Sequence, residues 1–250
     1  LLFTPKTIAP AKGWPIVVWA HGTTGVADIC APSKSSMDPD VKSMINELLS
    51  AGYVVVAPDY EGLGEPSGTE AHPYLNLKSE AFSITDAVVA TRDYLTKQGK
   101  SVSKNWVTVG HSQGGHAALG AGEYQSRAQL DYKGTVAIAP ASNSKTIFQV
   151  GAASVANLPA SQQVATYTSL NTYAPLITAG MQNPPNITLY GQVFESEAAR
   201  IARTAESACS GTVLVNYYTE MNISATTYNT LNGYYPKIGF LDVPVIKNFL

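Results

Sequence analysis

Residues 105–119, NWVTVGHSQGGHAAL, decide the fold of this chain. The run 106–109 predicts a buried strand, 110–114 a sharp turn, and 115–122 a helix that opens on alanines. A tight turn between a strand and a helix forces its apex residue into strained backbone geometry, so glycines must flank the apex where a Cβ would collide. This order makes the apex residue, Ser112, a candidate nucleophile. The alternative is that Ser112 only caps the helix, which is a common role for serine.

The segments around this turn alternate between strand and helix patterns. Apolar runs typical of buried parallel strands are 15–20 (PIVVWA), 53–57 (YVVVA) and 134–139 (GTVAIA). Stretches with the period of a helix are 38–52, bounded by Asp38-Pro39 and Gly52, and about 77–98. In the second helix we expect Ala81, Ile84, Val88 and Leu95 to face inward, and Lys78, Glu80, Asp86, Arg92 and Lys97 to face outward. Strands that alternate with helices predict an α/β fold with a mainly parallel sheet.

The alternation stops near Pro140, and the composition changes after it. Residues 146–194 contain no Asp, Glu, Lys, Arg or His. Helical patterns recur in this part, over 159–171 and 195–209. We therefore expect a partial α/β core over 1–140 and a mostly helical cap over 141–250. The uncharged residues either pack the cap against the sheet or form a lid over an apolar substrate pocket, and the two interpretations are compatible.

The charge composition excludes several classes of partner. Only 14% of the residues are charged and the net charge is −2, which argues against a nucleic-acid or polyanion ligand. No apolar run approaches the roughly 18 residues that cross a bilayer, so we expect no transmembrane segment. The chain begins without Met and without a basic leader, and we interpret it as a mature or excised piece of a monomeric protein.

Cys30 and Cys209 are the only cysteines. Neither has the spacing of a metal site, so no metal is expected. A disulfide between them would close a loop of about 180 residues, worth roughly 5 kcal/mol in the chain-entropy model. Two buried thiols are the alternative. We favour the disulfide, and with it a secreted or periplasmic location.

A serine hydroxyl is a weak nucleophile, so Ser112 needs a base and also donors for the oxyanion that forms on attack. One donor is expected from the backbone amide of Gln113, at the positive end of the helix that follows the turn. The other is expected from the loop 21–25 (HGTTG), where glycines would let the Thr23 N–H face Ser112. A simple glycine turn is the alternative for this loop.

The runs PIVVWAHGTTG, YVVVAPDYEGLG and VGHSQGGHAAL resemble the α/β-hydrolase superfamily. With HPYL at 72–75 and a large cap after Pro140, the set is similar to the secreted lipases of the lipase A type. The resemblance covers 1–140 well, and the cap only in its position and helical character. It implies hydrolysis of acyl glycerols or other hydrophobic esters through an acyl-enzyme on Ser112, without a cofactor. It also implies Thr23 and Gln113 as the oxyanion hole, an acyl-binding tunnel in the cap and contact with a lipid interface.

The chain departs from this superfamily in its histidines. The superfamily's catalytic triad runs Ser, then Asp or Glu, then His along the chain, whereas the four histidines of this chain are His21, His72, His111 and His116. None of them is placed as a base. His21 lies in the loop 21–25, and His72 suits a pocket wall. His111 is directed away from the serine, and His116 projects from the side of the helix.

The acidic partner is equally hard to find. Asp59 suits a residue that fixes a loop by accepting backbone hydrogen bonds, and Glu195 and Asp242 lie in the expected cap. We therefore expect the sheet to be cut off after the strand near 135–139, with the catalytic Asp and His beyond Leu250, and the isolated chain to be nearly inactive. An acyltransferase, or a module that binds a lipid or a partner without catalysis, are the alternatives.

Overall fold

The computed structural model describes residues 1–64, 70–182 and 188–249, which form two compact units. The first unit contains Leu1–Thr23, Ala31–Glu61 and Leu75–Ser142. The second contains Thr24–Cys30, Gly62–Tyr74 and Asn143–Leu250. The part predicted as a cap therefore lies in the second unit together with two short segments from the first third of the chain.

The first unit is built on a sheet of five strands in the order β1-β3-β2-β4-β5. Their bounds are Leu2–Phe3 (β1), Trp14–Ala20 (β2), Val54–Val56 (β3), Val102–His111 (β4) and Asp131–Ile138 (β5). All neighbouring pairs are parallel except β1 with β3, which makes the sheet mixed. The expected α/β fold with a mainly parallel sheet is confirmed.

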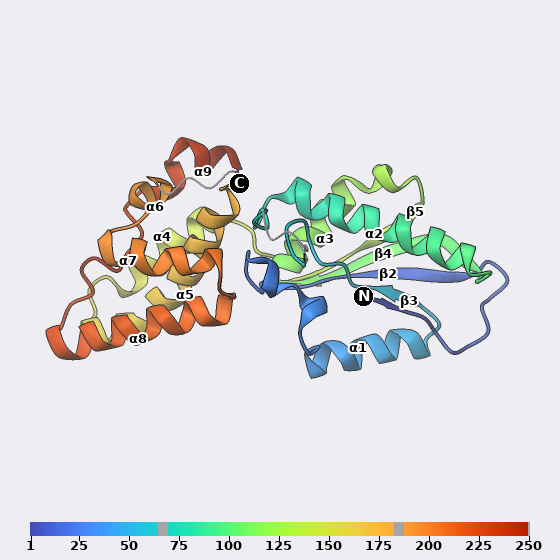
Figure 1. Cartoon of the computed structure of the whole chain (residues 1–250), viewed down its shortest axis with the longest axis horizontal. Coiled ribbons are helices and arrows are strands. Elements are labelled where there is room, and N and C mark those ends of the chain that lie inside the picture. The colour runs from blue at the N-terminus through green and yellow to red at the C-terminus, as the bar shows by residue number, and fades with distance from the viewer. Residues whose placement is uncertain (65–69, 183–187, 250) are drawn as a thin grey trace. The chain divides into compact units, whose positions relative to one another are not determined.

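Three helices flank this sheet, with α1 (Pro39–Ser50) on one face and α2 (Leu77–Lys97) and α3 (Gln113–Glu123) on the other (Figure 1). The Asp38 side chain caps α1 by accepting hydrogen bonds from the Asp40 and Val41 N–H groups. Asn76 caps α2 by accepting from the Ser79 N–H. Ile45 of α1 packs on Val17 and Val55 of the sheet. The helices begin within one or two residues of their predicted starts because these capping signals are local.

One residue of α2 contradicts its predicted orientation. The four apolar residues expected to face inward are buried, but Glu80, expected to face outward, is also fully buried. The period of apolar residues cannot identify an inward carboxylate, whose burial depends on donors elsewhere in the chain. Its partners are described with the site below.

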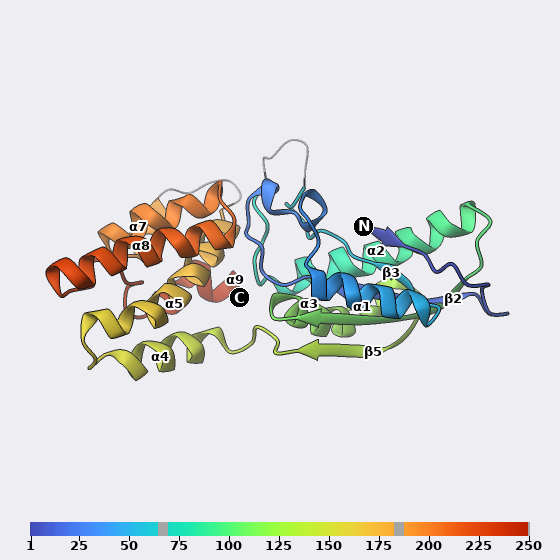
Figure 2. The same cartoon turned by 90° about the horizontal axis from the view of Figure 1, so that it is seen from below.

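The second unit is mostly helical (Figures 1 and 2). Its helices are α4 (Ser144–Val155), α5 (Ala160–Gly180), α6 (Thr188–Val193), α7 (Ser196–Ala202), α8 (Ser210–Tyr228) and α9 (Pro244–Phe249). The helix predicted over 159–171 is longer, because α5 continues through Pro175 where almost every side chain is buried. The helix predicted over 195–209 is shorter, since α7 tightens into a 3-10 turn after Ala202. Among the described residues, no helix combines the length and apolar character needed to cross a bilayer.

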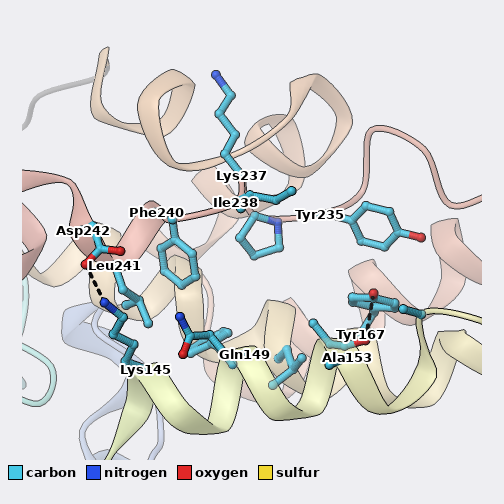
Figure 3. Close-up of a pocket in the computed structure, with 16 residues that line it drawn as sticks. Lys145, Gln149, Ala153, Tyr167, Tyr235, Lys237, Ile238, Phe240, Leu241 and Asp242 are labelled. Atoms are coloured by element: carbon cyan, nitrogen blue, oxygen red, sulfur yellow. Dashed lines mark hydrogen bonds and ion pairs between the residues drawn. The ribbon is translucent and has the colours of Figure 1, made fainter.

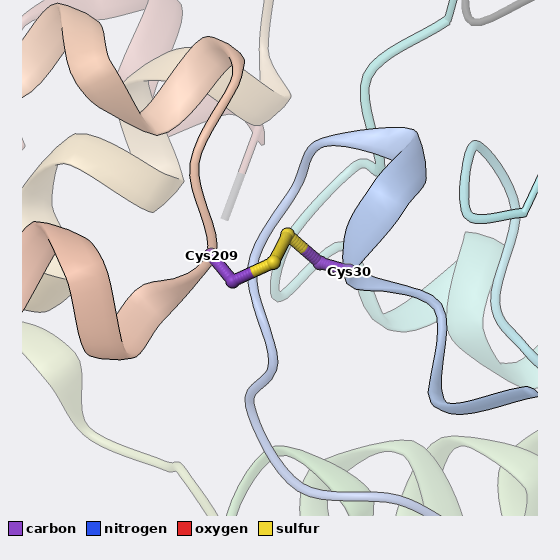
Figure 4. Close-up of a disulfide and its surroundings, with 2 residues drawn as sticks. All are labelled: Cys30 and Cys209. Carbon is purple, nitrogen blue, oxygen red and sulfur yellow. A yellow bond between two sulfur atoms is a disulfide. The ribbon is translucent and has the colours of Figure 1, made fainter. Parts of the chain in front are cut away.

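The predicted disulfide joins Cys30 to Cys209 within the second unit, with their Cα atoms 5.4 Å apart (Figure 4). Cys209 directly precedes α8, and the Ser210 N–H donates to the Thr24 carbonyl at 2.9 Å. Gly25 has to be glycine because a Cβ there would lie 2.7 Å from the Cys30 Sγ. The disulfide and this backbone bond hold the segment 24–30 against the start of α8.

Candidate active site

Ser112 lies between the end of β4 and the start of α3, with φ 57° and ψ −119°. Positive φ is rare for residues with a side chain, and such a conformation costs on the order of 1–3 kcal/mol. Backbone hydrogen bonds hold it: the Ser112 N–H donates to the Ile138 carbonyl at 3.0 Å, and its carbonyl accepts from the N–H groups of His116 at 3.1 Å and Ala141 at 3.0 Å. The structure therefore has the strained apex that the sequence predicts.

The glycines that flank Ser112 allow backbone segments to touch. A Cβ on Gly110 would lie 2.0 Å from the Gly114 carbonyl oxygen. A Cβ on Gly114 would lie 1.9 Å from the Ala20 carbonyl oxygen. Both obstacles are backbone atoms, which cannot rotate away as the end of a side chain can. The turn is thus packed directly on the end of β2.

The loop that carries Thr23 lies beside this turn. A Cβ on Gly22 would be 3.4 Å from the His111 carbonyl oxygen, and one on Gly114 would be 2.7 Å from the His21 carbonyl oxygen. Gln113 is the first residue of α3, where backbone N–H groups have no acceptor within the helix. The structure therefore brings together the two segments whose amides were predicted as donors, while the roles of Thr23 and Gln113 stay predictions.

His21 is fixed beside the turn in a neutral state. Its ring stacks on Tyr60 with centroids 4.1 Å apart, and its Nδ1 donates to the Gly22 carbonyl at 2.7 Å. Burial lowers the pKa of His21 to about 4, although the Gly22 carbonyl and the Asp59 charge act in the opposite direction. The Tyr60 hydroxyl donates to the His21 carbonyl at 2.9 Å. These contacts order the loop without using His21 as a base.

The lowered pKa of His21 predicts a pH-dependent stability. His21 binds a proton near its ordinary pKa of 6.5 in the unfolded chain, but only near pH 4 in the folded chain. The stability that the neutral, buried His21 contributes to the folded chain is therefore complete above pH 6.5 and is lost as the pH falls from 6.5 towards 4. Between pH 7 and pH 5 the loss should be about 2 kcal/mol. Urea unfolding at both pH values, compared with the His21→Phe variant, measures it. Equal pH dependence in the two proteins would contradict the prediction.

The other histidines have different surroundings. The His116 Nδ1 lies 2.8 Å from the Glu80 Oε2, so its ring projects from the side of α3, as predicted, and is turned towards α2. His72 is fully buried in the second unit, where its N–H donates to the Val26 carbonyl at 3.0 Å. His111 is exposed. Within the described part of the chain, the Ser112 hydroxyl forms no hydrogen bond with any of these rings.

The candidate acids also have other contacts. Asp59 accepts from the Ser33 N–H at 3.1 Å, which is the loop-fixing contact that its sequence position predicted. Asp242 pairs with Lys145 at 2.7 Å in the second unit, and this hydrogen bond and charge lower the pKa of the Asp242 carboxyl. Glu195 directly precedes α7, and its N–H donates to the Tyr235 carbonyl. No group of three or more metal-binding side chains occurs in residues 1–64, 70–182 and 188–249.

The second unit contains a cavity of about 390 Å³ between α4, α5 and the segment 235–242 (Figure 3). Its walls are mainly apolar or aromatic, among them Phe148, Leu170 and Phe240. Lys145 and Asp242 pair at one end, and Tyr167 and Tyr235 lie at the other. A cavity of this size and lining suits a small apolar ligand. No feature of the sequence beyond the scarcity of charges pointed to these particular residues.

Residues 17–233 match the model of the alpha/beta hydrolase family. A comparison with curated proteins gives no significant match. Among solved structures, the rice cell wall degrading esterase LipA of Xanthomonas oryzae is 22% identical, with a TM-score of 0.66 over 100% of this chain and 64% of that protein. Lipase A of Candida antarctica is 17% identical, with a TM-score of 0.64 over 100% of this chain and 54% of the lipase. The chain thus spans less than two thirds of either structure.

Proposed function

Because this chain belongs to the alpha/beta hydrolase family, we propose that it forms part of a serine hydrolase that cleaves carboxylic esters through an acyl-enzyme on Ser112. The observation that carries this proposal is the conformation of Ser112, at φ 57° between glycines that allow backbone contact with β2. Strain of this kind persists only where surrounding structure enforces it, and it occurs most often at functional sites.

In the proposed reaction, Ser112 Oγ attacks the ester carbonyl carbon and forms a new C–O bond. The negative charge that develops on the carbonyl oxygen is stabilised by the N–H groups of Thr23 and Gln113. A general base takes the hydroxyl proton and gives it to the departing alcohol. Water then attacks the acyl-enzyme, the carboxylic acid leaves, and Ser112 regains its proton.

We propose further that the base and its acidic partner come from sequence that follows these 250 residues. Three observations support this: no histidine follows His116, β5 is an edge strand, and two apolar side chains on that strand, Val136 and Ile138, are 53% and 48% exposed. A further parallel strand would cover this edge and would bring loops to the same end of the sheet as Ser112. The protein with this continuation is called the full-length protein below.

The proposed substrate is a hydrophobic ester such as an acyl glycerol, and the proposed subgroup is the secreted lipases of the lipase A type. The uncharged stretch 146–194 and the apolar cavity of the second unit support an apolar acyl group. The likeness in fold to an esterase and a lipase is consistent with it. The disulfide supports a location outside the cytoplasm, since such bonds persist in oxidising compartments.

The test is ester turnover by the full-length protein. We expect hydrolysis of p-nitrophenyl butyrate and p-nitrophenyl laurate, with the free acid as the main product even when an alcohol is added as a competing acceptor. An acyltransferase would instead give mainly the new ester. Absence of turnover on both substrates, with the protein folded, would contradict catalysis and favour a binding module.

A further inference from the structure

The carboxylate of Glu80, in the first unit, is a fully buried charged group that the proposed reaction does not use. Its side chain, on α2, is 0% exposed. An ionised carboxylate is stable in such a position only when donors satisfy it. Glu80 receives them from the Gln113 Nε2 at 2.8 Å, the His116 Nδ1 at 2.8 Å and the Leu75 N–H at 3.2 Å. One carboxylate therefore ties α2 to the first turn of α3.

The two residues of α3 that Glu80 holds are those that contact the backbone of Ser112. Gln113 follows Ser112 in the chain, and its own N–H is the proposed oxyanion donor. The His116 N–H donates to the Ser112 carbonyl at 3.1 Å. Anchoring the Gln113 side chain at its amide end restricts the rotation of the peptide group that carries the donor. Fixing His116 restricts the hydrogen bond that closes the first turn after Ser112.

The residue that orders the other donor segment, Tyr60, is close enough to Glu80 to respond to its charge. Burial and, to a smaller extent, the Glu80 charge raise the pKa of Tyr60 well above its ordinary value. As a donor, the Tyr60 hydroxyl holds the His21 carbonyl at 2.9 Å. That carbonyl begins the loop that leads to Thr23. Glu80 therefore bonds directly to the segment that carries the Gln113 donor, whereas only its charge reaches Tyr60, which holds the segment of the other donor.

We propose that Glu80 is a positioning residue of the oxyanion hole, acting through the side chains of Gln113 and His116. The identity of the donors rests on the proposed function, whereas the hold of Glu80 on Gln113 does not. A residue that only joins α2 to α3 would affect stability and leave the rate per folded molecule unchanged. A positioning residue affects the transition state, because the oxyanion forms only there.

The experiment compares Glu80→Gln with Asp86→Asn in the full-length protein. Both variants replace a carboxylate of α2 by its amide, but Asp86 is exposed and pairs with Arg127 on the surface. Glu80→Gln should lower kcat by about 10- to 100-fold per titrated active site, since a misplaced group costs up to about 100-fold and a lost oxyanion donor at least that. We expect KM to change less than about threefold, and Asp86→Asn to behave as the unmodified protein. A kcat of Glu80→Gln within twofold of the unmodified protein would overturn the proposal.

A second pair of variants covers the case in which Glu80→Gln does not fold. His116→Ala removes one donor to Glu80, and His116→Gln supplies an amide donor in its place. We expect kcat to fall by about 3- to 10-fold in His116→Ala, which is less than the effect of losing an oxyanion donor. In His116→Gln we expect kcat to recover at least partly. Equal kcat values for these two variants would count against positioning.

A measurement that does not depend on ester turnover distinguishes a failure of this proposal from a failure of the proposed function. In the ¹⁵N-labelled 250-residue chain, the backbone amide resonance of Gln113 should shift or broaden in Glu80→Gln and stay in place in Asp86→Asn. If the full-length protein has no ester turnover while this resonance responds, the proposed function fails and the hold of Glu80 on Gln113 stands. An unchanged Gln113 resonance would overturn that hold whatever the activity.

Discussion

The 250-residue chain should hydrolyse p-nitrophenyl butyrate about a millionfold more slowly than the full-length protein. A serine without a base is a poor nucleophile, and what remains comes from the oxyanion donors and from substrate binding. Steady-state kinetics on both proteins, with the folded fraction determined by circular dichroism, measure the ratio.

The Ser112→Ala substitution sharpens this prediction, because members of a catalytic triad act as a unit and their effects do not add. In the full-length protein the substitution should lower kcat by about a millionfold. In the 250-residue chain it should change the small residual rate by less than about tenfold, since the nucleophile there is already without its base. Strong turnover by this chain that disappears in Ser112→Ala would contradict the proposed position of the base. It would direct attention to His116 and His72.

The second large effect is expected for Gly114→Ala, which should lower the free energy of unfolding by on the order of 4 kcal/mol. The added Cβ would lie 1.9 Å from the carbonyl oxygen and 2.6 Å from the carbonyl carbon of Ala20. Both are backbone atoms of β2, a central strand, so relief requires the sheet and α3 to separate. Thermal unfolding should show a decrease in Tm of roughly 8–16 °C.

Gly211→Ala is the matched control, because a Cβ at Gly211, in the first turn of α8, meets nothing within 4 Å. Alanine favours a helix over glycine by up to about 1 kcal/mol, so this variant should be as stable as the unmodified chain or slightly more stable. A Tm of Gly114→Ala within about 2 °C of the unmodified chain would show that the turn is less closely packed on β2 than the structure indicates.

The first unit could be predicted largely from the sequence, because its signals are local. Strands buried on both faces of a parallel sheet are continuous apolar runs, as 15–20 and 53–57 are. The caps Asp38 and Asn76 mark helix starts within a few residues of the bonds that they make. The turn at Ser112 could be predicted because the glycines that it requires, Gly110 and Gly114, lie within two residues of Ser112 in the chain.

The cluster around Glu80 could not be predicted in the same way. On a helical period, a glutamate between Ser79 and Ala81 and near Lys78 is assigned to the solvent side. Its burial depends on Gln113 and His116, which lie 33 and 36 residues away in the sequence. Only the packing of α2 on α3 brings them within hydrogen-bond distance, and no pattern in a single helix reports it.

The helix ends and the extent of the second unit were harder to predict, because they also depend on contacts between residues that are far apart in the sequence. Residues 146–194 of this unit are uncharged and weakly periodic, so helix ends there depend on packing, as at Pro175 inside α5. The segment 24–30 belongs to this unit through the disulfide to Cys209 and the bond from Ser210 to Thr24. The cysteine pair indicated the first of these contacts, and nothing in the sequence indicated the second.

The central claim, that Ser112 is the nucleophile, is tested most directly by covalent labelling of the full-length protein with an alkyl fluorophosphonate, followed by peptide mass spectrometry. We expect one phosphonyl group per molecule, located on Ser112, no labelling in Ser112→Ala, and loss of ester turnover in proportion to labelling. A label on any other residue, or full turnover after complete labelling of Ser112, would contradict the claim.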